Sequence, residues 1–137
     1  MVFWRCHYHA IWTTYRREPL ITAAIEAVII EAIRRKSREL ACPLLAVNGV
    51  ADHIHVAVSI PPRIAAADWL RQVKGLSAYE INQHFPDRAT PFGWQTGYGL
   101  LTFDGRNLAY VVAYIENQKT HHADRTTEPY LEQVDDR

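Results

Sequence analysis

The stretch that decides the fold is ADHIHVAVSI, residues 51–60. Its alternation is typical of a β-strand, in which side chains two residues apart point to the same side of the sheet. We therefore expect Ile54, Val56 and Val58 to face the core. His53 and His55 would then stand side by side on the opposite face, as two imidazoles on a rigid platform.

The rest of the chain divides into segments with strand or helix patterns. Aromatic and β-branched residues predict a strand over 2–13, and apolar residues at helical spacing predict a helix over 20–40. Residues 44–48 and 54–60 predict two strands joined as an antiparallel hairpin. A helix is expected over 64–74, broken at Gly75 and resumed over 77–85. A fourth, glycine-interrupted strand is expected over 94–103, followed by a last helix that ends near Gln118.

This order predicts an α+β fold, with a ferredoxin-like or RNA-recognition-like antiparallel sheet of four strands and two helices on one face. One C-terminal helix is left over, and it can dock on its own sheet or on a neighbouring subunit. Residues 1–122 are expected to form the catalytic domain. Residues 123–137 are expected to form an acidic, flexible tail.

Length and composition agree with one globular domain. The chain has 137 residues, of which 48% are hydrophobic and 22% charged. Cys6 and Cys42 have no Cys-x-x-Cys spacing and are expected to be buried, reduced thiols. The sequence favours neither a signal peptide nor a membrane span, so a cytoplasmic protein is expected.

Charge is unevenly distributed along the chain. The formal net charge is zero, but residues 1–122 hold 13 Lys and Arg against 10 Asp and Glu, and residues 123–137 hold 2 against 5. The body is therefore mildly basic. Clusters at Arg16–Arg17, at 34–36 and around Arg71 and Lys74 could contact phosphates, or could equally form solvated surface.

Tyr114 and Gln118 lie four residues apart in the last predicted helix and so share a face. Two neutral imidazoles and a glutamine carbonyl suit a divalent cation such as Mg²⁺ or Mn²⁺ better than a structural zinc ion. A tyrosine held beside such an ion is a candidate nucleophile for attack on a phosphate.

Simpler interpretations remain open for each of these residues. A His-x-His pair on a strand can be two surface histidines, and His7 and His9 show the same spacing without companion ligands. Tyr114 could be a core residue, because aromatic side chains at helical spacing usually pack. Gln118 could be an ordinary polar helix residue.

Several motifs together resemble the single-tyrosine HUH transposases of bacterial and archaeal insertion sequences, the TnpA type, with their REP-associated relatives included. The resemblance covers most of the chain. The matching segments, in the order of the family, are residues 8–12 and 15–17, 52–62, 74–78, 94–99, 114–118 and 121–122.

The resemblance implies an enzyme that cleaves and rejoins single-stranded DNA at insertion-sequence ends through a 5′-phosphotyrosine intermediate. Tyr114 would be the nucleophile, and His53, His55 and Gln118 would bind Mg²⁺ or Mn²⁺. The expected partners are DNA hairpins and a second subunit, whose tyrosine helix can complete the site in trans. The residues expected to contact DNA are Arg16, Arg17, Lys74, Trp94 and Tyr98.

Three alternatives differ from this interpretation. The chain could be a non-catalytic single-strand-binding module that stacks bases on Trp4, Tyr8 or Trp12. It could be a domesticated relative of the transposase. It could also be a metal-dependent phosphodiesterase with water as its nucleophile.

Overall fold

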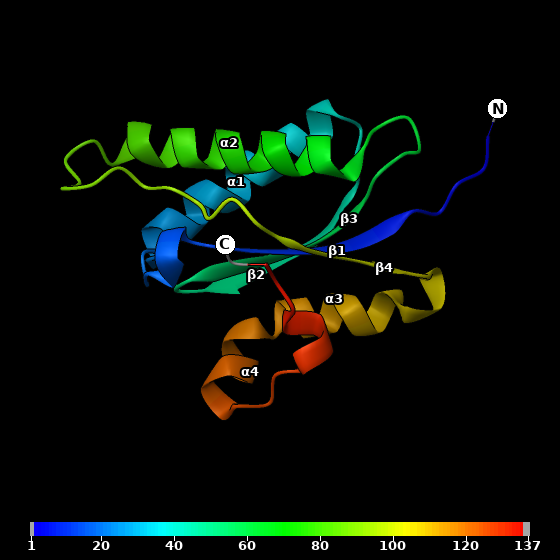
Figure 1. Cartoon of the computed structure of the whole chain (residues 1–137). Coiled ribbons are helices and arrows are strands. Elements are labelled where there is room, and N and C mark those ends of the chain that lie inside the picture. Colours follow the sequence, from blue (N-terminus) through cyan, green and yellow to red (C-terminus); the bar gives the residue numbers. More distant parts are fainter. Residues whose placement is uncertain (1, 136–137) are drawn as a thin grey trace.

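A four-stranded antiparallel sheet organises the computed structural model, which describes residues 2–135 (Figure 1). The strands are β1 (His7–Thr13), β2 (Leu44–Val50), β3 (His53–Ser59) and β4 (Gly99–Phe103). The α-helices are α1 (Ala23–Glu39), α2 (Ala66–His84), α3 (Leu108–Glu116) and α4 (Gln118–Asp124). Short 3-10 helices, η1 (Tyr15–Arg17), η2 (Gly105–Asn107) and η3 (Pro129–Glu132), complete the order.

The strand order is β2-β3-β1-β4, so β3 lies inside the sheet between β1 and β2. Trp12 pairs with Ile54 and Thr13 with His53, which sets the side chains of the two strands on matching faces. All seven residues of β3 are buried. The side chains on both faces of β3 are therefore shielded from solvent.

Helices α1 and α2 cover one face of the sheet, above it in Figure 1. Ile54, Val56 and Val58 lie in the core beneath them, as the alternation in β3 predicts. Trp12 is fully buried there, with its ring edge-on to Trp69 at a centroid distance of 6.2 Å. The indole of Trp69 donates to the Ser37 hydroxyl at 3.0 Å, which ties α2 to α1.

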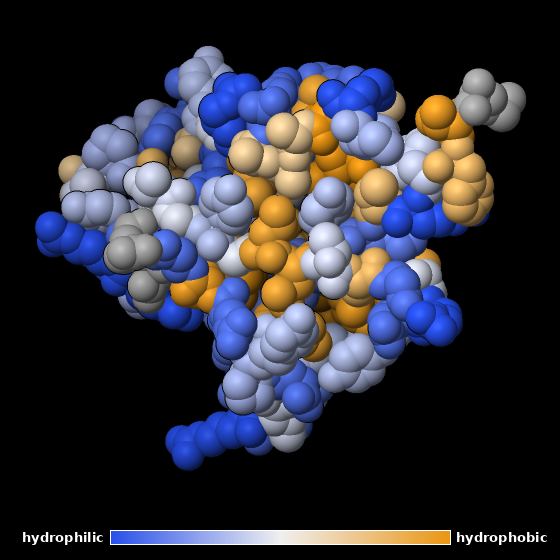
Figure 2. All heavy atoms as spheres, turned by 45° about the vertical axis from the view of Figure 1, so that its right-hand side comes forward, coloured by the Kyte–Doolittle hydropathy of each residue, from blue (hydrophilic) through white to orange (hydrophobic). Residues whose placement is uncertain are grey.

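Helices α3 and α4 and the C-terminal segment lie against the opposite face (Figure 1). Ala46, Ala57, Val111 and Ile115 form a second, smaller core there. This face is covered less completely, because no residue of edge strand β4 is fully buried. Figure 2 shows hydrophobic residues in a band across the visible surface, between polar parts above and below.

The structure confirms the predicted α+β class, the antiparallel sheet and the β2–β3 hairpin. It also confirms that two helices, α1 and α2, cover one face of the sheet and that the C-terminal helical residues lie apart from them. Both cysteines are free, with Cys42 buried and Cys6 half-buried. Among the described residues, the helices contain no stretch long and apolar enough to cross a bilayer.

Several predicted boundaries are wrong. Helix α2 runs through Gly75 without a break, and the first strand begins at His7 rather than at residue 2. Strand β4 begins only at Gly99. Trp94 instead forms an isolated bridge with Thr14. The last predicted helix is two helices, because the backbone leaves helical geometry at Asn117.

The proposed stacking surface of the non-catalytic alternative is also not present as expected. Trp12 is fully buried under the helices, and Tyr8 packs against the same core. Trp4 is half-buried and precedes β1. These three rings therefore do not form one open platform for bases.

Two glycine substitutions test the packing of the fold, and they are expected to change the free energy of unfolding in opposite directions. A Cβ added at Gly75, inside α2, meets no atom within 4 Å. Gly75→Ala should therefore raise the free energy of unfolding by about 0.5–1 kcal/mol, because alanine is the better helix former.

The same change at Gly49 in β2 is expected to destabilise the protein. A Cβ at Gly49 would lie 2.3 Å from the backbone oxygen of His53, so the β2–β3 hairpin would have to shift. Urea unfolding of both variants measures the two effects. Destabilisation by Gly75→Ala would show that the space beside α2 is filled.

Candidate metal and nucleophile site

His53 and His55 form the floor of a polar cluster on the face of the sheet opposite α1 and α2. Their side chains are 2% and 0% exposed, and their ring centroids lie 5.1 Å apart. The expectation of a side-by-side pair is therefore correct. Because both residues belong to the interior strand β3, their position is set by hydrogen bonds to two neighbouring strands.

Each of these rings is oriented through its Nδ1 atom. His53 Nδ1 lies 2.7 Å from Asp52 Oδ1, and since an ionised carboxylate can only accept, the imidazole donates. His55 Nδ1 lies 2.8 Å from His9 Nε2 on β1. Arg17 reaches Asp52 from the other side, with 3.7 Å between Nε and Oδ2. Both Nε2 atoms therefore face the same space.

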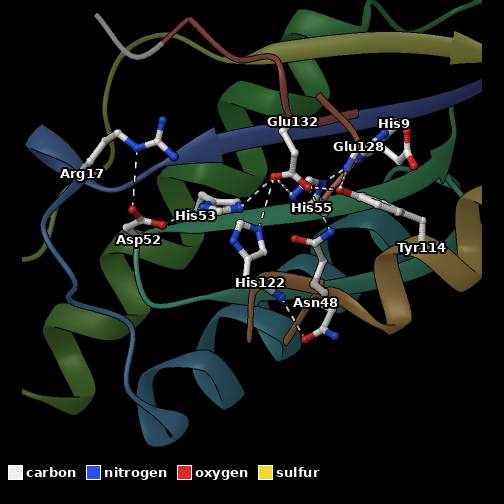
Figure 3. Close-up of polar contacts among 12 residues, drawn as sticks. His9, Arg17, Asn48, Asp52, His53, His55, Tyr114, His122, Glu128 and Glu132 are labelled. Atoms are coloured by element: carbon white, nitrogen blue, oxygen red, sulfur yellow. Dashed lines mark hydrogen bonds and ion pairs between the residues drawn. The ribbon is translucent and has the colours of Figure 1, made fainter. Parts of the chain in front are cut away.

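The Glu132 side chain, from η3, enters that space (Figure 3). Its Oε1 atom lies 3.1 Å from His55 Nε2, 3.3 Å from His53 Nε2 and 3.4 Å from His122 Nε2. One ligand atom from each of these four residues lies within 4.8 Å of the others. Three imidazoles and a carboxylate thus form a group that could hold a metal ion.

Tyr114, from α3, is joined to the same carboxylate. Its hydroxyl donates to Glu132 Oε2, and Gln118 Nε2 donates to the same oxygen at 3.2 Å. The backbone N–H of Glu128 donates to the Tyr114 hydroxyl at 3.0 Å. His121 stacks on the Tyr114 ring with 4.6 Å between centroids. The tyrosine is therefore held on several sides and is only 3% exposed.

Burial and charge determine the protonation states. Burial and, secondly, the neighbouring His55 lower the pKa of His9 to about 3. Burial also lowers the pKa of His55, although the Glu132 carboxylate acts in the opposite direction. Both imidazoles are thus neutral at pH 7, and each keeps a nitrogen lone pair.

The pKa values of the Glu132 carboxyl and the Tyr114 phenol are shifted in opposite directions. Burial alone would raise the pKa of Glu132, but its contacts with His53 and His55 outweigh burial and hold that pKa well below its usual range. Burial and the hydrogen bond to Glu132 raise the pKa of Tyr114 to about 12. At pH 7 the carboxylate is charged and the phenol keeps its proton.

All four predicted site residues, His53, His55, Tyr114 and Gln118, come together around Glu132 within a single chain. The break at Asn117 does not separate Tyr114 from Gln118, since both donate to the same oxygen. Gln118 is fully buried. The roles of these residues stay predictions, but their convergence is observed.

The sequence-based site prediction gave no role to His9, Asp52, His122 or Glu132, although the first three lie in segments that resemble the family. His9 and Asp52 carried a signal, because His9 shares the spacing of the HUH pair and Asp52 precedes it directly. His122 and Glu132 carried none that periodicity could reveal. The sequence predicts a flexible tail over 123–137, outside the catalytic domain, whereas the structure places Glu132 of that segment inside the cluster.

The five predicted DNA-contact residues make local contacts of their own. The guanidinium of Arg16 lies over the Tyr15 ring, and Arg17 approaches Asp52. Lys74 Nζ donates to the backbone oxygens of residues 95, 96 and 97, and burial lowers its pKa. Trp94 and Tyr98 line a cavity of about 370 Å³ together with Lys74. Their contact with DNA stays a prediction.

Comparison with known proteins connects this site to a family. Residues 2–118 match the family described as Transposase IS200 like. The chain is 31% identical over 121 residues to the transposase for insertion sequence element IS200 from Salmonella typhimurium strain LT2. That match covers 84% of this chain and 78% of the relative.

Two solved structures share the fold. A crystal structure from Deinococcus radiodurans R1, described as that of a transposase, superimposes with a TM-score of 0.69 at 25% identity. It covers 85% of this chain and 93% of the other. A REP-associated tyrosine transposase bound to a REP hairpin gives a TM-score of 0.64 at 16% identity, covering 89% and 74%.

The site pairs two histidines on a strand with a buried tyrosine on a helix. Together with the fold and the sequence match, this defines the class of protein. The chain belongs to the IS200-like transposase family.

The acid stability of the metal-free protein tests the buried His9–His55 pair. The unfolded chain binds a proton at His9 below about pH 6.5, whereas the folded protein does not until about pH 3. The free energy of unfolding should therefore fall as the pH is lowered through this window, by at most about 1.4 kcal/mol per pH unit for this residue.

His9→Gln should flatten that dependence, because glutamine cannot bind the proton. Urea unfolding in EDTA at several pH values between 7 and 4 measures the slope. His84→Gln, which removes an exposed histidine from α2, serves as the control. An unchanged slope in His9→Gln would contradict the assignment of a neutral, buried His9.

Proposed function

We propose that this protein is a metal-dependent transposase that cleaves and rejoins single-stranded DNA through a covalent bond to Tyr114. One observation carries the proposal. The Tyr114 hydroxyl and the Nε2 atoms of His53 and His55 all approach the same carboxylate, that of Glu132. An ion held by the two imidazoles would therefore lie beside the tyrosine hydroxyl, within reach of a phosphodiester bound to that ion.

We propose that His53, His55 and Gln118 hold a divalent ion, Mg²⁺ or Mn²⁺. Support comes from buried polar atoms without hydrogen-bond partners in the described part of the chain, which include His53 Nε2 and Gln118 Oε1. Such atoms are costly unless they meet a partner, and a cation is one. The ion would polarise a phosphate oxygen and stabilise charge in the transition state.

The chain's own residues account for the transfer step. The Tyr114 oxygen would attack phosphorus, forming a phosphotyrosine bond as the bond from phosphorus to the 3′ oxygen breaks. The phenol proton would pass to Glu132 Oε2, which already accepts its hydrogen bond, and then to the departing 3′ oxygen, which becomes a 3′-OH. In the metal-free site burial raises the pKa of Tyr114 to about 12, so the phenol is protonated there, and we expect it to lose its proton during attack.

The proposed partners are hairpins in single-stranded DNA and a second subunit. Basic and aromatic side chains line the cavity at Lys74 and Trp94, and this supports the binding of a single DNA strand there. The tyrosine helix docks on its own sheet in this structure. In a homodimer, the same contacts could form in trans.

Tyr114→Phe should abolish the covalent intermediate, because only the hydroxyl can bond to phosphorus. The assay incubates the protein with Mn²⁺ and 3′-labelled single strands that carry a hairpin with randomised flanks. The labelled 3′ fragment should stay attached to the protein on a denaturing gel.

Tyr110→Phe is the matched control, since Tyr110 lies on the same helix but is 56% exposed. It should form the adduct as the parent does. If Tyr114→Phe forms the adduct equally well, Tyr114 is not the nucleophile.

His53→Ala separates catalysis from binding. Loss of one imidazole should reduce the adduct by at least about tenfold through weaker metal binding. The affinity for the same hairpin DNA, measured by fluorescence anisotropy in EDTA, should change little. Full adduct formation by His53→Ala, or by the parent in EDTA, would favour a function that needs no metal.

A further inference from the structure

His122 and Glu132 lie outside the ligand set that the HUH motif and Gln118 provide. They come from α4 and η3, two short elements that follow the tyrosine helix in the chain. Both side chains nevertheless point toward the ring nitrogens of His53 and His55, Glu132 from above and His122 from below in Figure 3. Their presence there needs an explanation beyond the motif.

The distances match those between ligands that share an ion. Nitrogen and oxygen ligands sit about 2.1 Å from a divalent transition metal, so neighbouring ligand atoms are about 3.0–3.4 Å apart. The Glu132 Oε1 atom lies 3.1, 3.3 and 3.4 Å from the three imidazole Nε2 atoms. Glu132 therefore already has the spacing from each imidazole that a shared ion requires, and the four ligand atoms all lie within 4.8 Å of one another.

Hydrogen bonding alone does not satisfy this cluster. His53 Nε2 and His122 Nε2 are buried and have no hydrogen-bond partner among the described residues, although Glu132 is near both. His53 is 2% exposed, so bulk solvent does not reach this nitrogen. Nitrogen lone pairs that converge without good hydrogen-bond geometry are expected at a cation site.

We propose that His122 and Glu132 are ligands of the same divalent cation as His53 and His55. The C-terminal segment then completes the ion site. Binding of the ion would also fix the position of Tyr114, because Glu132 contacts both. Glu132 binds the ion through Oε1 and accepts from Tyr114 through Oε2. This inference rests on the ion site of the proposed function, and it holds whether or not DNA is cleaved there.

The donor set determines which cation is preferred. Mg²⁺ favours oxygen ligands and retains water, whereas imidazole nitrogen suits transition metals. Three imidazoles and one carboxylate should therefore bind Mn²⁺ more tightly than Mg²⁺. Without His122 and Glu132, the remaining ligands should show a smaller difference in affinity between Mn²⁺ and Mg²⁺.

The C-terminal segment is seated by close backbone contacts beyond Glu132. A Cβ added at Gly99 would lie 2.0 Å from the Gln133 carbonyl oxygen, and one at Gly97 would lie 2.1 Å from that of Asp135. The segment thus runs directly against β4 and the residues before it. An ion bound by Glu132 would hold the same segment at its other end.

The test measures Mn²⁺ binding to the metal-free protein, without DNA, by electron paramagnetic resonance of the free ion. Glu132→Gln and His122→Ala should each weaken Mn²⁺ binding by at least about tenfold. The controls are Glu31→Gln, an exposed glutamate on α1, and His84→Ala, an exposed histidine on α2. Both controls should bind Mn²⁺ as the parent does.

A second readout counts the ligands directly. Pulsed electron paramagnetic resonance of bound Mn²⁺ should detect imidazole nitrogen couplings that diminish in His122→Ala but not in Glu132→Gln. Mn²⁺ should also raise the melting temperature of the parent more than Mg²⁺ does at equal concentration. Circular dichroism of each variant verifies that it is folded.

Unchanged or tighter Mn²⁺ binding by folded Glu132→Gln would overturn the proposal. That result would mean that an ion displaces the carboxylate from the cluster. Unchanged nitrogen couplings in His122→Ala would likewise remove His122 from the ligand set. Because neither measurement uses DNA, failure here is distinct from failure of Tyr114 to form an adduct.

Discussion

The two-sided burial of β3 is the constraint on which the rest of the structure depends. One face of this strand packs Ile54 and Val56 under α1 and α2, and the other carries His53 and His55. Because side chains alternate strictly along a strand, a register slip of one residue would drive both imidazoles into the apolar core. Strand pairing that builds the core therefore also positions the site.

Burying so many polar groups would be costly without internal partners, since each unsatisfied group costs about 1–3 kcal/mol. Asp52 and His9 orient the two imidazoles, and Glu132 meets them from above. The ionised Glu132 carboxylate brings a negative charge into this half-buried space, beside the neutral His9 and His55. A divalent cation would compensate that charge, which gives one electrostatic reason for the same cluster to serve binding and catalysis.

Local pattern predicted β3, its hairpin with β2, and the helix before it, because two-residue and 3.6-residue periodicities need only neighbouring residues. It failed where packing outweighs local preference. Gly75 lowers helix propensity by about 1 kcal/mol, yet buried Val73 and Ser77 on either side keep α2 continuous. Asn117 carried no strong signal for the break that separates α3 from α4.

The order of amino acids alone was enough to single out the histidine pair, Tyr114 and Gln118 as candidates, because each belongs to a compact motif. Folding decided which other side chains join them. His9 arrives through strand pairing, and Glu132 arrives 77 residues after His55 through the seating of the C-terminal segment. Such contacts depend on the packing of whole elements, so a short window could show the His-x-His spacing of His9 but not that His9 meets His55, nor that Glu132 joins them.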